Sequence, residues 1–251
     1  EAIANSLKQI GGQLRGLAIT LAGCETLTDK GLEHIAGSLA TKILANLQRL
    51  SIDLQGCSKI TDDGVQSLSN TIGQHINKLE SLSLNFSSCG NIANDGAKAI
   101  AIGIIKNLVK LKRFSIQVRG CDKFTNKGAE ALANNIAKYW TNIEELNIDF
   151  SKCIKVTDQA AKALVTGFAR GLKNLKSLSL NFSGCELTIK GTEALRSNIR
   201  QLSSLKRLHI DLSLCMQISK EEIEILGKNL VEGLVNLQEF TVVHDSQRDF
   251  V

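Results

Sequence analysis

Seven cysteines are the residues best suited to chemistry, and they recur at nearly constant intervals. They are Cys24, Cys57, Cys89, Cys121, Cys153, Cys185 and Cys215, with spacings of 33, 32, 32, 32, 32 and 30 residues. None forms a C-x-x-C pair and no histidine stands at ligand spacing, so a zinc site is not expected. Each cysteine follows an alternating apolar segment. This placement predicts buried, reduced thiols that act as small hydrophobic side chains, which is typical of an intracellular, cytoplasmic protein.

Ser179, His209 and Asp211 are the residue types of a hydrolytic triad. They would project from an open sheet, where the sequence implies neither a pocket nor oxyanion donors, so we do not expect a triad. Asp53, Asp149 and Asp211 fall on predicted strands that are not neighbours and cannot share one metal ion. We therefore expect no catalytic residue, no metal, no cofactor and no small-molecule substrate.

The cysteines are positioned by a repeated segment in which apolar and polar residues alternate. In Leu50-Ser51-Ile52-Asp53-Leu54 the period of two predicts a half-buried strand. A fixed period of this length indicates a solenoid. The eight copies are 14–24, 47–57, 79–89, 111–121, 143–153, 175–185, 205–215 and, without a cysteine, 237–244.

A helix is predicted after each strand. In the second repeat Thr61 can cap the helix and Asp62 lies in its first turn, where the helix dipole favours negative charge. The helix itself has an apolar stripe at Val65, Leu68 and Ile72. Strands joined in parallel by helices predict an α/β horseshoe of about eight repeats, with a curved parallel sheet on the concave face and helices on the convex face.

The run Cys57-Ser-Lys-Ile60-Thr61-Asp62-Asp63-Gly64-Val65 resembles the leucine-rich repeat, closest to its cysteine-containing and ribonuclease-inhibitor-like classes. Compared with the usual cysteine-containing repeat, two extra residues precede the cysteine. They lengthen the strand by one inward-facing and one outward-facing residue, and in this the repeat is similar to those of protozoan families. The resemblance implies a noncatalytic scaffold that binds other proteins.

The resemblance leaves three more specific roles open. One is the substrate-recognition module of an F-box-type ubiquitin-ligase subunit, and another is a structural component of a cytoskeletal or ciliary assembly. The third is a Ran-type GTPase-activating protein, against which the positive net charge and the lack of a visible arginine loop or acidic tail count.

Composition narrows the class of partner. Of 251 residues 43% are hydrophobic and 22% charged, with a net charge of +5 and no proline. No apolar run reaches the roughly 18 residues that a membrane span needs, and Lys and Arg are scattered, so neither a membrane nor a nucleic-acid partner is expected. We expect one domain over residues 1–251. Residues 1–7 resemble the later helical segment 130–136, which predicts a fragment of a longer array.

The outward strand residues form columns across the predicted sheet, and these columns are the candidate protein-binding site. Trp140 aligns with leucines and is predicted to lie in the core, whereas Tyr139 is predicted to be exposed. The polar ladders could also serve only to solvate the sheet; if they bind a partner, the C-terminal half is favoured. The candidate residues are Arg49, Asp53, Arg113, Gln117, Arg119, Asp149, Asn181, Arg207, His209 and Asp211.

Overall fold

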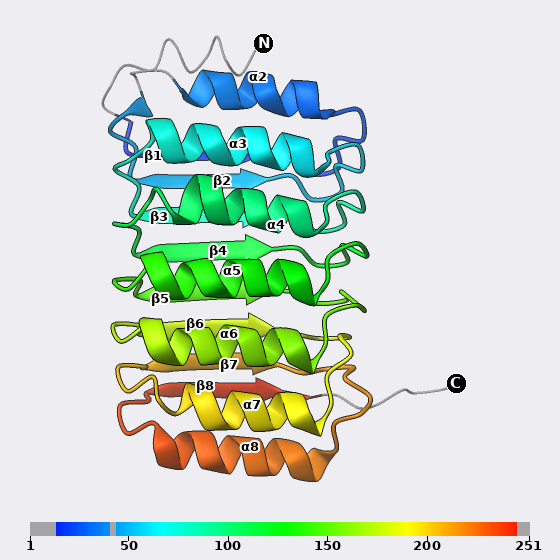
Figure 1. The fold of residues 1–251 in the computed structure, drawn as a ribbon, viewed down its shortest axis with the longest axis vertical. Helices are drawn as coiled ribbons and strands as arrows, with labels where there is room; N and C mark the ends of the chain where they lie inside the picture. Colours follow the sequence, from blue (N-terminus) through cyan, green and yellow to red (C-terminus); the bar gives the residue numbers. More distant parts are fainter. Residues whose placement is uncertain (1–13, 41–43, 245–251) are drawn as a thin grey trace.

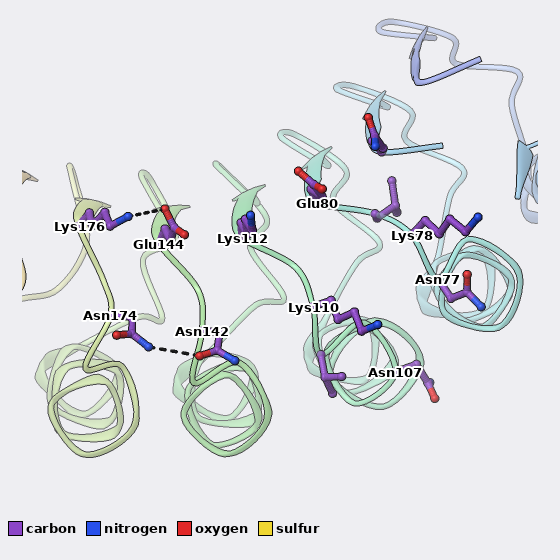
Figure 2. Close-up of a pocket in the computed structure, with 13 residues that line it drawn as sticks. Asn77, Lys78, Glu80, Asn107, Lys110, Lys112, Asn142, Glu144, Asn174 and Lys176 are labelled. Carbon is purple, nitrogen blue, oxygen red and sulfur yellow. Dashed lines mark hydrogen bonds and ion pairs between the residues drawn. The ribbon is translucent and has the colours of Figure 1, made fainter. Parts of the chain in front are cut away.

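The computed structural model describes residues 14–40 and 44–244 as a stack of strand-and-helix units. One layer holds an eight-stranded parallel sheet in the order β1 to β8, and a second layer holds the helices (Figure 1). The strands lie along the inner side of an arc and the helices along its outer side (Figure 2). The predicted α/β horseshoe is therefore confirmed. The predicted helix over 1–7 lies outside the described residues.

The elements alternate along the described chain, with one strand and one helical segment in each of the first seven repeats and the strand β8 in the last. They are β1 (Gly16–Thr20), α2 (Asp29–Leu39), β2 (Arg49–Asp53), α3 (Asp62–His75), β3 (Ser81–Asn85), α4 (Asn94–Ile100) with the π-helical turn η2 (Ala101–Ile105), β4 (Arg113–Gln117), α5 (Asn126–Tyr139), β5 (Glu145–Asp149), α6 (Asp158–Gly171), β6 (Ser177–Asn181), α7 (Ile189–Ile199), β7 (Arg207–Asp211), α8 (Lys220–Gly233) and β8 (Glu239–Val243).

The core lies between the two layers and is filled by the fixed positions of the repeat. In β2 the side chains of Leu50 and Ile52 are buried, and Leu54 directly after the strand is fully buried as well. Leu54 is the inward member of the extra pair that the lengthened repeat predicts. Its N–H donates to Asn85 O at 2.8 Å, so the parallel hydrogen-bond ladder continues past the last strand residue.

Two side-chain ladders join successive repeats at the carboxyl ends of the strands, one as far as Thr188 in the sixth repeat and the other as far as Cys215 in the seventh. The predicted cap is confirmed, since Thr61 Oγ1 accepts the N–H of Asp63. Asp29 of the preceding repeat also accepts from the backbone N–H and the hydroxyl of Thr61, at 2.9 and 2.8 Å. Asp62 in turn accepts from Ala93 N at 2.7 Å. The polar residue after the cap therefore binds the neighbouring repeat, in addition to lying in the first turn of its helix.

The second ladder is made by the cysteines. Each buried thiol donates to a backbone carbonyl of the preceding repeat, as Cys89 does to Leu54 O at 3.0 Å and Cys153 to Val118 O at 3.1 Å. All seven cysteines are free, and only Cys24 is partly exposed. The prediction of buried thiols is confirmed for six of the seven cysteines and is wrong for Cys24.

Burial of the thiols predicts slow chemical modification. Desolvation raises the pKa of Cys89, Cys153 and Cys215 to about 11, because the thiolate is the form that burial disfavours. Since the thiolate is the reactive species, we expect one fast equivalent from Cys24 and slow reaction of the other six with a disulfide reagent at pH 8. A stopped-flow assay checks this, with Cys24→Ala as the control that removes the fast phase. Rapid labelling of most thiols in the folded protein would contradict it.

Candidate functional site

The outward side chains of the eight strands form three columns on the concave face, in the register that the repeat predicts. Arg113 pairs with Ser81 on one side and with Glu145 on the other. His209 lies between Ser179 and Thr241 in the second column. From β2 to β7 the inward strand residues are buried, whereas the outward residues retain exposed surface. The columns are therefore a real surface of the molecule.

The first column contains the charged side chains that interact across the strands of the sheet. Arg207 on β7 reaches over β6 and donates to Glu145 on β5 at 3.2 Å. Both side chains are more than 40% exposed, so this ion pair contributes little to stability. Arg49 and Arg113 form no ion pair with any residue of 14–40 or 44–244, and they leave guanidinium groups on the N-terminal half of the face.

The third column has a structural role that the sequence pattern does not reveal. The carboxylate of Asp149 accepts the N–H of Ser151 at 2.8 Å and holds the turn that follows β5. The same bond recurs at equivalent positions. It joins Asp53 to Gln55, Asn85 to Ser87, Asn181 to Ser183 and Asp211 to Ser213. Four candidate partner-binding residues, Asp53, Asp149, Asn181 and Asp211, are therefore also turn-forming residues.

The turn bond of the third column gives a stability prediction. Asp149→Ala removes the acceptor of a backbone N–H, and we expect the free energy of unfolding to fall by about 1 kcal/mol. Asp149→Asn keeps an acceptor and should be nearly neutral, because Asn85 and Asn181 fill the same role. Urea denaturation of both variants checks this. An asparagine variant as unstable as the alanine variant would contradict it.

Repeat four departs from this pattern. Gln117 ends β4, whereas the other strands from β2 to β7 end in Asp or Asn, and Arg119 lies two residues further on, in the turn rather than on the strand. Arg119 is thus placed at the carboxyl edge of the sheet, beside the concave face proper, and is exposed. The predicted C-terminal group of Arg207, His209 and Asp211 does lie on one strand.

A shallow hollow lies at the middle of the concave face. It has a volume of about 240 Å³ and spans β3 to β6. Its polar lining consists of small residues, namely Ser81, Ser83, Ser115, Asn147, Ser177 and Ser179, with Arg113 and Glu145 beside them. Asn147 donates to Ser115 at 3.1 Å. An open floor of short polar side chains can accept projecting side chains of another molecule without enclosing it.

Other kinds of site have less support. Ser179 and His209 are neighbours in the sheet, but the Asp211 carboxylate accepts from Ser213 N. Across the part of the chain that is described, no three His, Cys, Asp or Glu side chains gather as a metal site. No described helix has the length and apolar character needed to cross a membrane. Trp140 is fully buried, as predicted, and Tyr139 is half-buried rather than exposed.

Comparison with known proteins agrees with this architecture. The family model described as leucine-rich repeat matches residues 50–69 and 78–101. None of the curated proteins matches the chain.

Two solved structures illustrate the similarity. One, described as "Leiomodin-1 Actin-Binding Site 2 (ABS2)", is 16% identical over 60% of this chain and 78% of its own, with a TM-score of 0.43. The other, "Crystal structure of Rad7 and Elc1 complex in yeast", is 18% identical over 90% of this chain and 70% of its own, with a TM-score of 0.32. The residues that the family model matches contain leucine-rich repeats, and the described chain folds as a leucine-rich-repeat solenoid.

Proposed function

We propose that this chain is a noncatalytic scaffold that binds another protein on the concave face of its sheet. The observation that carries the proposal is the open face itself. Eight strands present outward side chains on one side, and the hollow at the centre of that side is wide and shallow. Such a surface fits the projecting side chains of a folded partner better than it fits a small molecule, which proteins usually enclose.

The chemistry of the face supports a polar, adaptable interface. Its centre consists of serines and one asparagine, with Arg113 available for an acidic group of the partner. The outward columns of β3 to β6 hold no tryptophan, tyrosine or phenylalanine, which are the usual anchors of tight interfaces. We infer that the affinity comes from many polar contacts and that binding is reversible.

Site-specific crosslinking tests the proposal. A photoreactive benzoylphenylalanine at Ser83 places the probe in the central hollow, and the same residue at Lys162 on α6 is a matched control on the convex side. After irradiation in an extract of the source cells, we expect discrete protein adducts from the Ser83 variant that the Lys162 variant lacks. The absence of adducts, or identical adducts from both variants, would contradict a concave binding site.

The identity of the captured protein decides among the finer roles. A ubiquitin-ligase substrate would favour the F-box-type module, and a filament or axonemal protein would favour a cytoskeletal or ciliary role. Stimulated GTP hydrolysis in an assay with a small GTPase would support the Ran-type activator instead. We further propose a cytoplasmic location and the cysteine-containing, ribonuclease-inhibitor-like class, of protozoan type, since the thiol ladder recurs in every repeat from Cys57 to Cys215.

A further inference from the structure

A larger groove lies at the opposite ends of the strands from the cysteine turns. It has a volume of about 940 Å³ and is bounded by the segments that lead from the helices into the strands, from Gln48 before β2 to Lys176 before β6 (Figure 2). Five successive strands at roughly 4.8 Å spacing make it about 19 Å long. This is the length of about five or six residues of extended peptide.

A row of side chains three positions before the strands runs along the edge of this groove, which is lined by its members Lys78, Lys110, Asn142 and Asn174, and continues beyond both ends of the groove. We call it the edge row, and it consists of Asn46, Lys78, Lys110, Asn142, Asn174, Ser204 and Asn236. Most of its members bind the preceding repeat. Lys78 donates to Asn46 at 2.7 Å and Asn174 to Asn142 at 3.2 Å. Ser204 and Asn236 donate to backbone carbonyls of the preceding repeat at 2.7 and 2.8 Å.

The edge row is interrupted at Lys110, which lies between Lys78 and Asn142 (Figure 2). Its neighbour Lys78 carries the same charge and cannot accept a hydrogen bond from it. Among the residues that the structure describes, none forms an ion pair with the Lys110 ammonium. Lys78 and Lys110 therefore line the groove from adjacent repeats, the first bound to Asn46 and the second without an ion pair, and an anion placed beside Lys110 would be attracted by both charges.

The inner wall of the groove alternates in charge. Glu80, Lys112, Glu144 and Lys176 precede four successive strands, and Lys176 binds Glu144 at 2.8 Å. Lys176 and then Lys112 lower the pKa of Glu144, so this carboxylate stays ionised. Because the wall compensates its own charges, the edge-row lysines supply the excess positive charge of the groove.

An apolar contact lies beside these cations. Val109 lines the groove and is 48% exposed, although it sits between the charged Lys110 and the buried Leu108. The groove thus offers an exposed apolar side chain from the residue that precedes Lys110. A ligand that uses both features carries an acidic group next to an apolar one.

We propose that the groove binds an extended protein segment in which an aspartate or glutamate adjoins an aliphatic or aromatic residue. The acidic side chain lies between Lys78 and Lys110, and its apolar neighbour packs on Val109. The carboxylates of Glu80 and Glu144 line the same groove, and they would repel a continuous polyanion. The groove therefore suits a peptide with isolated acidic residues better than it suits a nucleic-acid strand. This site is separate from the concave face and does not depend on the function proposed for it.

Selection from a random octapeptide display library tests the groove. We expect the enriched peptides to carry Asp or Glu beside Leu, Ile, Val or Phe. A fluorescent copy of the strongest peptide should bind at least tenfold more weakly to the Lys78→Glu, Lys110→Glu double variant, measured by anisotropy. The matched control is Lys162→Glu with Lys190→Glu, which has the same net charge but lies on α6 and α7. It should change the affinity less than twofold.

Several results would overturn the proposal. The first is that the wild type enriches peptides no more than the double variant does. The second is that the enriched peptides lack acidic residues, and the third is that the control variant weakens peptide binding as much as the double variant does. Tighter binding of a ten-nucleotide single-stranded RNA, lost in the same double variant, would assign the groove to nucleic acid instead. Because the Ser83 crosslinking experiment probes another face, its failure and the failure of this proposal can be told apart.

Discussion

Gly73→Ala is expected to lower the free energy of unfolding by about 3 kcal/mol. A Cβ atom on Gly73 would overlap Gly103 O and lie 2.9 Å from the carbonyl carbon of the same residue. Both atoms belong to the backbone of η2, so no side-chain rotation can relieve the clash, and α3 must move away from η2. Overfilling a packed interface typically costs about 1–3 kcal/mol, and a collision with backbone belongs at the upper end.

The measurement is urea denaturation followed by the fluorescence of Trp140, the only tryptophan in the chain. Gly37→Ala is the matched control, because Gly37 also lies in a helix, α2, and a Cβ atom added there would have open space for 4 Å around it. That variant should be more stable by up to about 1 kcal/mol, since alanine is the better helix former. A Gly73→Ala protein as stable as the wild type would show that the two helices are not held this close.

The fold can be predicted because the sequence repeats its constraints. Leu50, Ile52, Leu54 and Cys57 each recur about every 32 residues, and their alternation determines strand, face and register for the whole sheet. A segment whose secondary structure is ambiguous in one repeat can be assigned from the equivalent segments of the other repeats. Isolated Ser, His and Asp residues can also be assessed as catalytic candidates, because a solenoid places each column of outward side chains on a known side of the sheet.

The contacts between repeats are harder to predict, because they depend on distances that a period does not contain. Asp62 can be assigned to the first turn of a helix, but its bond to Ala93 N depends on how closely the next repeat stacks. For Asp149 and Asp211 the alternation indicates outward, partner-binding groups. That pattern cannot show that a carboxylate bends back to the N–H two residues later.

The groove at the amino ends of the strands escapes prediction for a similar reason. Its residues lie in the connections between helix and strand, where no periodic apolar pattern marks a face. The available signal is the presence of lysine at positions 78 and 110 in a row that otherwise holds Asn or Ser. Such exceptions to a repeat are easier to find by aligning the connections than by aligning the strands.

Trp140→Ala is expected to lower the free energy of unfolding by about 3–5 kcal/mol, the usual cost of emptying a large aromatic site. The indole is fully buried and packs edge-on against Phe114, with ring centroids 4.8 Å apart. Tyr139→Ala is the adjacent control. Because Tyr139 is half-buried, its truncation should cost clearly less. Circular dichroism during urea denaturation measures both, since one variant lacks the fluorophore.

A third variant separates packing from polarity at this position. The Trp140 Nε1–H is buried and has no hydrogen-bond partner among the described residues, and an unpaired buried donor costs about 1–3 kcal/mol. Trp140→Phe removes that donor while keeping an aromatic ring against Phe114. The gain offsets part of the lost volume, so this variant should lie within about 1 kcal/mol of the wild type. If Trp140→Phe is instead as unstable as Trp140→Ala, the indole N–H has a hydrogen-bond partner whose loss destabilises the protein. The shape of the ring alone would then not explain why tryptophan is accommodated at a position where other repeats have leucine.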